Sequence, residues 1–507
     1  MSPPTQREKL VVGYGQVLRN AGFNLAGRIL PAIVAIVAIP IIIHGLGMER
    51  YGILSLALVI VSYFGLFDFG LGEAATKFVA GALGRGDFEC LPPLIWTSTA
   101  LIGGLSLLAG LLMFLASPLL ASHLLKVSVG LQGEATAAFR AMAAAVPFML
   151  LASGLRGTLE AKQRYDLVNI VSVPTNVANY LIPLVAVLLH AGLVPILCYL
   201  VVARAGTCLA YFFLCLRLFP ELRHSTRIDL KRVRPLLAFG GWLAISNLSW
   251  PLLLYLDRLV VGSILPVASL PYYAAPCEVV TRLWILPASW AALYPAFSAV
   301  GEDRYPELAN LCARALKHLA LLMGPIVIVA VFFAGKILLI WLGESFQLQS
   351  GLVFRILAVG VLVNSLSTVP DRLVKGLGRP DIIAKLHVAE LPLYGALLVV
   401  LVERWGIVGA AVAWTARATA EACIVFAVSL RLVPPSGAAI WRAGMPRLAI
   451  SLVSLAAAMW IAVRFFNGPA QFALGGLFLL ASAAFTWRCV LDRDDREFLL
   501  SALNLAT

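Results

Sequence analysis

Five arginines lie inside long apolar stretches of this sequence. They are Arg28, Arg204, Arg258, Arg282 and Arg417. A permanent positive charge in an apolar span costs several kcal/mol unless water or an opposite charge is close by. Guanidinium groups also present a planar fork that binds two phosphate or carboxylate oxygens at once. These residues therefore indicate either the binding of an anion within a membrane or ion pairing between helices.

Two of these arginines have no acidic residue four positions away on their own helix. Their neighbours at that spacing are Asn24 and Ala32 for Arg28, and Leu200 and Cys208 for Arg204. Side chains four apart share a helix face, so neither guanidinium has a local carboxylate to pair with. We therefore expect the first half to enclose a water-filled, electropositive cavity in which both arginines bind an anionic substrate.

Two of the other arginines do have an acid at helical spacing. Glu278 precedes Arg282 by four residues, and Glu421 follows Arg417 by four. Each pair lies on one face of a helix, which predicts a structural or gating ion pair. A role in a cationic binding cavity stays open for both arginines.

The remaining charges in apolar stretches are less easily paired from sequence. Arg258 follows Asp257 directly, which places the two on different faces, and Arg258 lies near the end of its stretch, where it can snorkel. Glu390 has no base four positions away, so it must be protonated, paired with another helix such as that of Arg417, or part of a proton or Na⁺ path. The candidates for ion coupling or gating are therefore Asp257, Glu278, Glu390 and Glu421.

The elements that carry these charges are predicted to be transmembrane helices. Of the 507 residues 61% are hydrophobic and only 13% are charged, about half the usual share of a soluble domain. A helix needs about 20 apolar residues to cross a bilayer. We predict an all-α membrane protein with about fourteen such helices, at 21–43, 51–73, 93–116, 137–158, 167–190, 193–216, 239–262, 268–292, 319–340, 352–370, 382–402, 407–430, 448–465 and 469–488.

The basic residues predict the orientation of these helices. Of the 39 Lys and Arg, 27 fall on the side that carries the N-terminus, seven on the other side and five within the spans. Cytoplasmic loops are enriched in Lys and Arg, so both termini are predicted to be cytoplasmic and the span count even. This rule explains the net charge of +13 better than nucleic-acid binding does, and phosphates of the inner leaflet are the expected partners of the basic loops.

The second half of the chain repeats the first. Segment 192–220 resembles 406–434 at an offset of 214 residues, and 22–24 resembles 241–243 at an offset of 219. Duplicated domains keep their order and spacing while side chains change, and transporters often consist of two similar halves with the substrate site between them. We expect an N-terminal six-helix lobe (1–220), a C-terminal six-helix lobe (221–435), and two extra helices with a cytoplasmic tail (436–507).

No catalytic constellation is recognisable. The sequence has no GxSxG, Walker or HExxH motif, its six histidines lack metal-ligand spacing, and no loop is long enough for a soluble catalytic domain. We therefore predict that the protein is not an enzyme and has neither a metal nor a cofactor. A membrane glycosyltransferase or polymerase is the enzymatic alternative, but it requires a large loop or acids near a metal site.

Several stretches, taken in order, resemble one transporter family. They are ERYG at 49–52, DFGL at 68–71, LDRLVVG at 256–262 with Tyr273, KGLGRP at 375–380 and GIVGAA at 406–411. In their order and spacing these residues resemble the polysaccharide flippases of the multidrug/oligosaccharidyl-lipid/polysaccharide exporter superfamily. No single stretch is diagnostic, but together they cover most of the chain.

The resemblance implies a flippase of the bacterial inner membrane. Such a protein moves a polyprenyl-pyrophosphate-linked oligosaccharide from the cytoplasmic to the periplasmic leaflet, for the assembly of O-antigen, capsule or exopolysaccharide. It also implies a polysaccharide polymerase and a chain-length regulator as partners. The alternatives are a multidrug or cation antiporter of the same superfamily and a peptidoglycan lipid-precursor flippase. The arginines without local acids in the first half argue against a carrier of cationic drugs.

Overall fold

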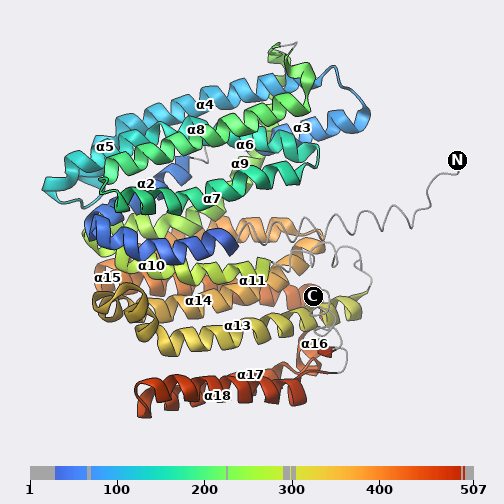
Figure 1. The fold of residues 1–507 in the computed structure, drawn as a ribbon. Helices are drawn as coiled ribbons and strands as arrows, with labels where there is room; N and C mark the ends of the chain where they lie inside the picture. The colour runs from blue at the N-terminus through green and yellow to red at the C-terminus, as the bar shows by residue number, and fades with distance from the viewer. Residues whose placement is uncertain are drawn as a thin grey trace. The chain divides into compact units, whose positions relative to one another are not determined.

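The protein is helical throughout the part that its structure describes (Figure 1). The computed structural model describes residues 29–64, 70–223, 226–288, 297, 304–434, 436–492 and 495–496, and only the backbone at 238–251. The chain forms two compact units, divided between Ala275 and Pro276. Each unit is described separately below.

The first unit contains the helix Ile29–Leu46 and a series of longer and shorter helices after it. These are α2 (Met48–Phe64), α3 (Leu71–Arg85), α4 (Leu91–Leu119), α5 (Gln132–Ala143), α6 (Ala145–Ala161), α7 (Tyr165–Leu188), α8 (Leu193–Leu218), α9 (Leu230–Ile264) and the first half of α10 (Leu270–Thr281). A π-helical turn (Leu120–Leu124) follows α4, and 3₁₀ turns precede α5, α9 and α10.

The second unit contains the remaining helices. These are α11 (Ile285–Ala288), α13 (Tyr305–Leu342), α14 (Glu344–Gly376), α15 (Pro380–Leu432), α16 (Ser436–Arg442), α17 (Met445–Phe465) and α18 (Pro469–Phe485). A 3₁₀ turn (Arg282–Trp284) leads from α10 to α11, and a π-helical turn (Thr486–Val490) ends α18.

Ten helices of the described chain are long and apolar enough to cross a membrane. One of these, α15, contains a break at Gly406, where φ is 59° and ψ is −138°. These angles are not helical, so the break separates two helical segments. Glycine adopts this positive φ readily, whereas other residues do so only at a cost in free energy. It falls between the predicted spans 382–402 and 407–430, as the sequence indicated.

Three of the predicted spans are not continuous helices. In the stretch 51–73, α2 ends at Phe64 and α3 begins at Leu71 after Gly70, which has a φ of 67°. The stretch 137–158 is shared by α5 and α6, which meet at Ala144, and the stretch 268–292 contains the 3₁₀ turn between α10 and α11. Hydropathy does not reveal these breaks because the residues on both sides of each are apolar.

In the first unit α6 is the central packing element. It contacts α3, α4 and α8, while α7 packs on α8. Its small residues allow this close approach, since Gly154 faces Ile102 of α4 and Gly157 faces the backbone of Gly72 in α3. Small residues at helix contacts are the usual means of tight packing where lipid supplies no hydrophobic drive. The result is a scaffold that holds α7 and α8 together.

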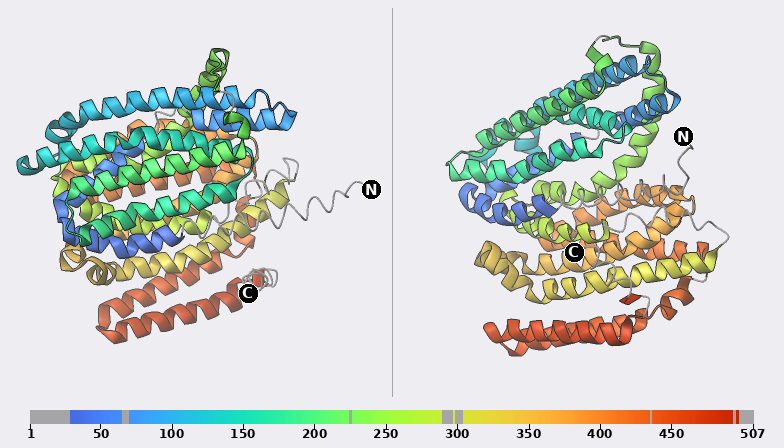
Figure 2. Two further views of the ribbon diagram at one scale, coloured as in Figure 1. Left: turned by 45° about the horizontal axis from the view of Figure 1, so that its top comes forward. Right: turned by 45° about the vertical axis from the view of Figure 1, so that its right-hand side comes forward.

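In the second unit α14 packs between α13 and α15, and α17 and α18 lie side by side along α13 (Figures 1 and 2). Phe333 of α13 packs against Leu455 and Met459 of α17 and stacks on Phe472 of α18. The two extra helices predicted at the C-terminus are thus joined to the unit through α13.

A buried ion pair fastens the chain after α18 to α13. Lys317 is only 1% exposed, and its Nζ lies 2.6 Å from Oδ2 of Asp495, which is 3% exposed. Burial alone raises the pKa of Asp495, but the hydrogen bond from Lys317 and its charge outweigh this effect and lower that pKa. The contact therefore holds a charged carboxylate against the side of α13.

Candidate substrate and ion sites

The structure describes four of the five predicted arginines. Arg28 lies outside the described residues, as does Asp68. Arg204 and Arg258 belong to the first unit, and Arg282 and Arg417 belong to the second. The four guanidinium groups differ in their polar partners, and these partners determine what else each group can bind.

Arg204 lies midway along α8 and is bonded to a neutral group. Its Nη2 donates to Oδ1 of Asn179 on α7 at 2.9 Å. The next polar contact between the two helices joins the hydroxyls of Thr175 and Thr207 at 2.8 Å. Arg204 forms no ion pair with any acid that the structure describes. Its charge is therefore oriented by an amide but not neutralised by it.

Asp257 is fully buried in α9 and accepts two hydrogen bonds. One comes from the hydroxyl of Tyr273 on α10, and the other comes from the backbone N–H of Arg258 at 2.7 Å. The guanidinium carbon of Arg258, Cζ, lies 5.7 Å from the ring centre of Tyr255. The carboxylate of Asp257 is thus held by a tyrosine hydroxyl and a backbone N–H group.

Arg282 is paired in the way that its spacing predicts. Its Nη2 donates to Oε1 of Glu278, four residues earlier, and both side chains are about three-quarters buried. The pair lies where α10 gives way to a 3₁₀ turn. The opposite charge is therefore supplied within the same stretch of helix.

A buried cluster of charges occupies α15 of the second unit. Nη1 of Arg417 donates to Oε2 of Glu421 at 2.9 Å and to Oε2 of Glu390 at 3.2 Å. Nε2 of His387 lies 3.3 Å from the other oxygen of Glu421. Arg417, Glu390 and Glu421 are 6%, 8% and 7% exposed. Both ion pairs predicted for Arg417 are observed, one along its helix segment and one across the break at Gly406.

The cluster contains one carboxylate more than its single guanidinium can neutralise. Within the described residues Glu390 Oε1 and Arg417 Nε are buried and have no hydrogen-bond partner. Because an isolated buried charge is costly, a proton on Glu390, a proton on His387 or a bound monovalent cation would each neutralise the cluster. No group of three metal-ligating side chains occurs among the described residues.

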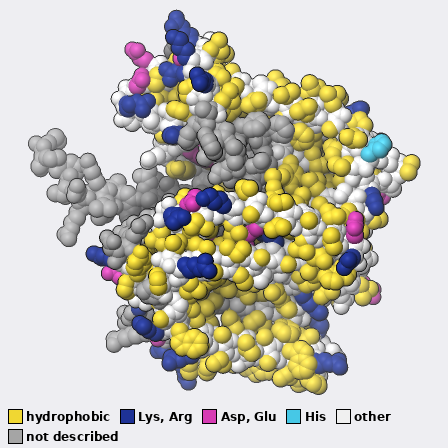
Figure 3. All heavy atoms as spheres, turned by 180° about the vertical axis from the view of Figure 1, so that it is seen from behind, with side chains coloured by type: hydrophobic (Ala, Val, Ile, Leu, Met, Phe, Trp, Pro, Cys, Tyr) yellow, Lys and Arg dark blue, Asp and Glu magenta, His cyan; other side chains and the backbone are white. Residues whose placement is uncertain are grey.

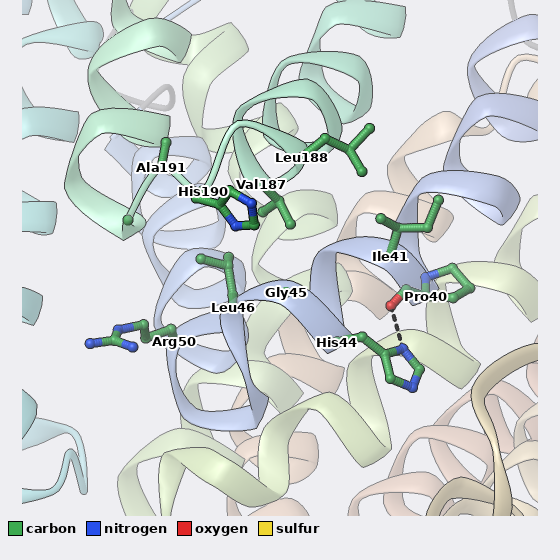
Figure 4. Close-up of a pocket in the computed structure, with 11 residues that line it drawn as sticks. Pro40, Ile41, His44, Gly45, Leu46, Arg50, Val187, Leu188, His190 and Ala191 are labelled. Carbon is green, nitrogen blue, oxygen red and sulfur yellow. Dashed lines mark hydrogen bonds between the residues drawn. The ribbon is translucent and has the colours of Figure 1, made fainter.

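A cavity of about 640 Å³ opens between the ends of the first helix and α7 (Figure 4). His44, Arg50 and His190 contribute its basic groups. Figure 4 shows that these groups do not converge, since His44 turns back to the carbonyl of Pro40 and Arg50 extends away from His190. Arg50 is also neutralised, with Nε 3.0 Å from both oxygens of Glu134. The cavity therefore does not form a focused anion site.

Two residues of these sites, His387 and Tyr273, were not predicted from residue spacing. His387 precedes Glu390 by three residues, so the two side chains share a helix face. The histidines were considered only as metal ligands, and this pairing was therefore not predicted. Tyr273 entered only as part of the family resemblance, although it is the hydroxyl that satisfies Asp257. A search for polar side chains at helical spacing could have found the first, whereas the second depends on the fold.

Comparison with known families decides what kind of protein this is. A family model described as polysaccharide biosynthesis protein matches residues 17–300, more than half of the chain. The chain belongs to the polysaccharide biosynthesis protein family. The family predicted from the sequence is thereby confirmed.

Relatives of this polysaccharide biosynthesis protein include two bacterial membrane proteins. A Shigella flexneri protein named "Putative O-antigen transporter" is 29% identical over 417 residues, covering 81% of this chain and 96% of that protein. A Bacillus subtilis (strain 168) protein named "Uncharacterized membrane protein EpsK" is 25% identical over 371 residues, covering 69% and 70% respectively.

Solved structures show the same fold. The lipid II flippase MurJ in an inward closed conformation matches with a TM-score of 0.71 and 12% identity, covering 93% of this chain and 99% of that one. An inward-facing MATE family transporter of the MOP superfamily matches with a TM-score of 0.65 and 15% identity, covering 80% and 98%. The polysaccharide biosynthesis protein is thus a multi-pass membrane protein with a fold of this superfamily.

The surface of the protein is largely apolar on the face that Figure 3 shows, where hydrophobic side chains cover much of the area.

Proposed function

We propose that this protein is a flippase for a polyprenyl-pyrophosphate-linked oligosaccharide. It moves this substrate from the cytoplasmic to the periplasmic leaflet of the bacterial inner membrane, for the assembly of a surface polysaccharide. The name of the Shigella flexneri relative and the matching family support this proposal. A polysaccharide polymerase and a chain-length regulator are the partners that this role implies.

The observation that carries the proposal is the uncompensated charge of Arg204. It lies in the middle of a 26-residue apolar helix and its described polar partner is the neutral amide of Asn179. In an apolar span such a charge is tolerated when it faces water or an anion. A pyrophosphate provides this anion, and the planar guanidinium can bind two of its oxygens. Arg28 is proposed to share this role.

The proposed architecture has fourteen spans with both termini in the cytoplasm. Two six-helix lobes (1–220 and 221–435) carry the repeat, and 436–507 adds two helices and a tail. The sugar crosses in a hydrated cavity while the polyprenyl chain stays in lipid. The substrate drives alternating access only if its affinity differs between the two states.

The other charged residues are assigned supporting roles. Arg258, Arg282 and Arg417 extend the cationic lining, each held by the contacts described above. Asp257, Glu278, Glu390 and Glu421 are proposed to act in gating or ion coupling. The cluster at Glu390 is the strongest candidate for ion coupling because one of its two carboxylates is not balanced by a guanidinium.

The test replaces Arg204 and Arg28 in a bacterium that lacks its own copy of this protein. Arg204→Ala and Arg204→Gln are expected to reduce surface polysaccharide by about ten-fold or more, because a charge-assisted bond to phosphate is lost. Glutamine retains an amide donor on a shorter side chain and removes the charge. Lipid-linked sugar units should accumulate at normal protein levels, while Arg204→Lys should retain part of the activity.

The matched control is Arg164→Ala, which removes an exposed arginine of the same unit that pairs with Asp166 at 2.7 Å. This variant should export normally. Near-normal export by the alanine variants of both Arg28 and Arg204 would contradict the proposed site. The cationic site would then move to Arg258, Arg282 and Arg417, and the antiporter alternative would regain weight.

A further inference from the structure

A second cavity lies in the first unit, where α4 ends and α5 begins, apart from the residues assigned above. Its volume is about 550 Å³, and Pro118, Ser122, Gln132, Thr136 and Arg140 contribute to its lining. We propose that this cavity binds the phosphate group of an anionic membrane phospholipid, with Arg140 as the anchoring residue.

The polar groups of the cavity are arranged along one face of α5. Gln132, Thr136 and Arg140 are spaced four residues apart, so an amide, a hydroxyl and a guanidinium follow one another along the helix. The opposite face, which includes Ala135, Phe139 and Met142, is buried. Because helical side chains lean toward the N-terminus, Arg140 is directed along this row toward the start of α5.

Arg140 has the donor capacity that a phosphate requires. Its guanidinium forms no hydrogen bond or ion pair with any described residue, and its recorded contact is with the ring of Phe114 on α4, 5.2 Å away. The nearest acid along α5, Glu134, is already bound to Arg50. Five N–H groups are therefore open to an external anion, and the ring holds the guanidinium in place.

The surroundings favour a lipid rather than a soluble anion. Leu111, Leu112, Leu115 and Leu119 on α4 are all exposed, so this side of the helix is suited to acyl chains. The start of α5 lies at the end of the span, where a headgroup would lie and where a long basic side chain can reach it. With the proposed orientation this end faces the outer leaflet. That leaflet assignment rests on the proposed function, but the phosphate site itself does not.

The test is native mass spectrometry of the full-length protein in detergent supplemented with phosphatidylglycerol. Wild type and Arg140→Lys should retain at least one phosphatidylglycerol. In Arg140→Ala and Arg140→Gln the occupancy of this lipid should fall by about ten-fold, which is the effect of losing a charge-assisted bond to phosphate. Arg164→Ala serves as the control and should retain the lipid as the wild type does.

Two outcomes would overturn the proposal. The first is equal retention of phosphatidylglycerol by wild type, Arg140→Ala and Arg140→Gln, each verified as folded by size-exclusion chromatography. The second is displacement of the lipid by millimolar inorganic phosphate, which would indicate a site for free phosphate instead. Failure of the Arg204 experiment would leave this result unchanged, because lipid retention is measured without transport.

Discussion

Among individual residues, the partner of each buried arginine separates structural charges from those available to a ligand. Arg417 contacts two carboxylates, whereas Arg204 contacts an amide. Both lie in apolar helices, so the difference arises from the acids that the same helix and its neighbours supply. A paired guanidinium is neutralised by the protein itself, while an unpaired one depends on water for its solvation or on an anionic substrate for its counter-charge.

Removal of Arg417 should destabilise the protein strongly. Arg417→Ala leaves Glu390 and Glu421 buried without their common partner, and breaking such a pair typically costs about 3–5 kcal/mol of unfolding free energy. Denaturant titration in detergent micelles would measure this loss. In the triple variant that combines Arg417→Leu with Glu390→Gln and Glu421→Gln, part of the stability should return because no charge remains.

The comparison with Arg204 tests the structural difference between the two arginines. Arg204→Ala should reduce export while changing stability much less than Arg417→Ala does, since no carboxylate is left behind. If both variants lost stability equally, the distinction between a structural and a substrate-directed arginine would be wrong.

At the level of helices, close packing of α14 against α15 positions the charged cluster. Gly360 of α14 lies against Thr415 and Trp414, the residues that precede Arg417 by two and three positions. A β-carbon at position 360 would come within 2.6 Å of Thr415 Oγ1 and 2.7 Å of the Trp414 ring. The two helices can therefore approach at this point only without a side chain on α14.

Alanine at position 360 should therefore be destabilising. Inserting a methyl group into a filled contact typically costs about 1–3 kcal/mol, and Gly360→Ala should lower the unfolding free energy by about this amount. Gly351→Ala is the matched control on the same helix, since nothing lies within 4 Å of its added carbon. That change should be neutral or slightly stabilising. Equal stabilities for the two variants in thermal unfolding would contradict this prediction, because they would show that Thr415 and Trp414 move aside at little cost in free energy.

For the whole molecule, the distribution of basic residues and the alternation of helices predict how the chain is threaded through the membrane. The connection between α3 and α4 is predicted to lie in the cytoplasm, and the connection between α4 and α5 on the opposite side. Both connections are short and contain exposed residues, Glu89 in the first and Val129 in the second.

This threading can be tested by cysteine labelling in intact cells. In a variant without the eight natural cysteines, Val129→Cys should react with a membrane-impermeant maleimide, whereas Glu89→Cys should react only after the membrane is opened. The positive-inside rule is the physical reason for this expectation. Labelling of Glu89→Cys in sealed cells would reverse the proposed orientation, and with it the leaflet of the Arg140 site.

The sequence by itself determined the class of the protein, its family and most of its helices. Apolar stretches of span length require a lipid environment, because no soluble fold of this size could bury them. Spacing along one helix was also sufficient to pair Arg282 with Glu278 and Arg417 with Glu421. These results depend on local periodicity, which a linear sequence contains in full.

Only the tertiary structure decided which charges are balanced across helices. It brings Tyr273 to Asp257, Asn179 to Arg204 and His387 to Glu421. It also breaks three apolar stretches that hydropathy had joined, and it places Arg140 beside Phe114 without a hydrogen bond to any residue in the described part of the chain. Such contacts depend on the rotation and depth of each helix. These are set by packing between small residues, and hydropathy along one helix contains no information about them.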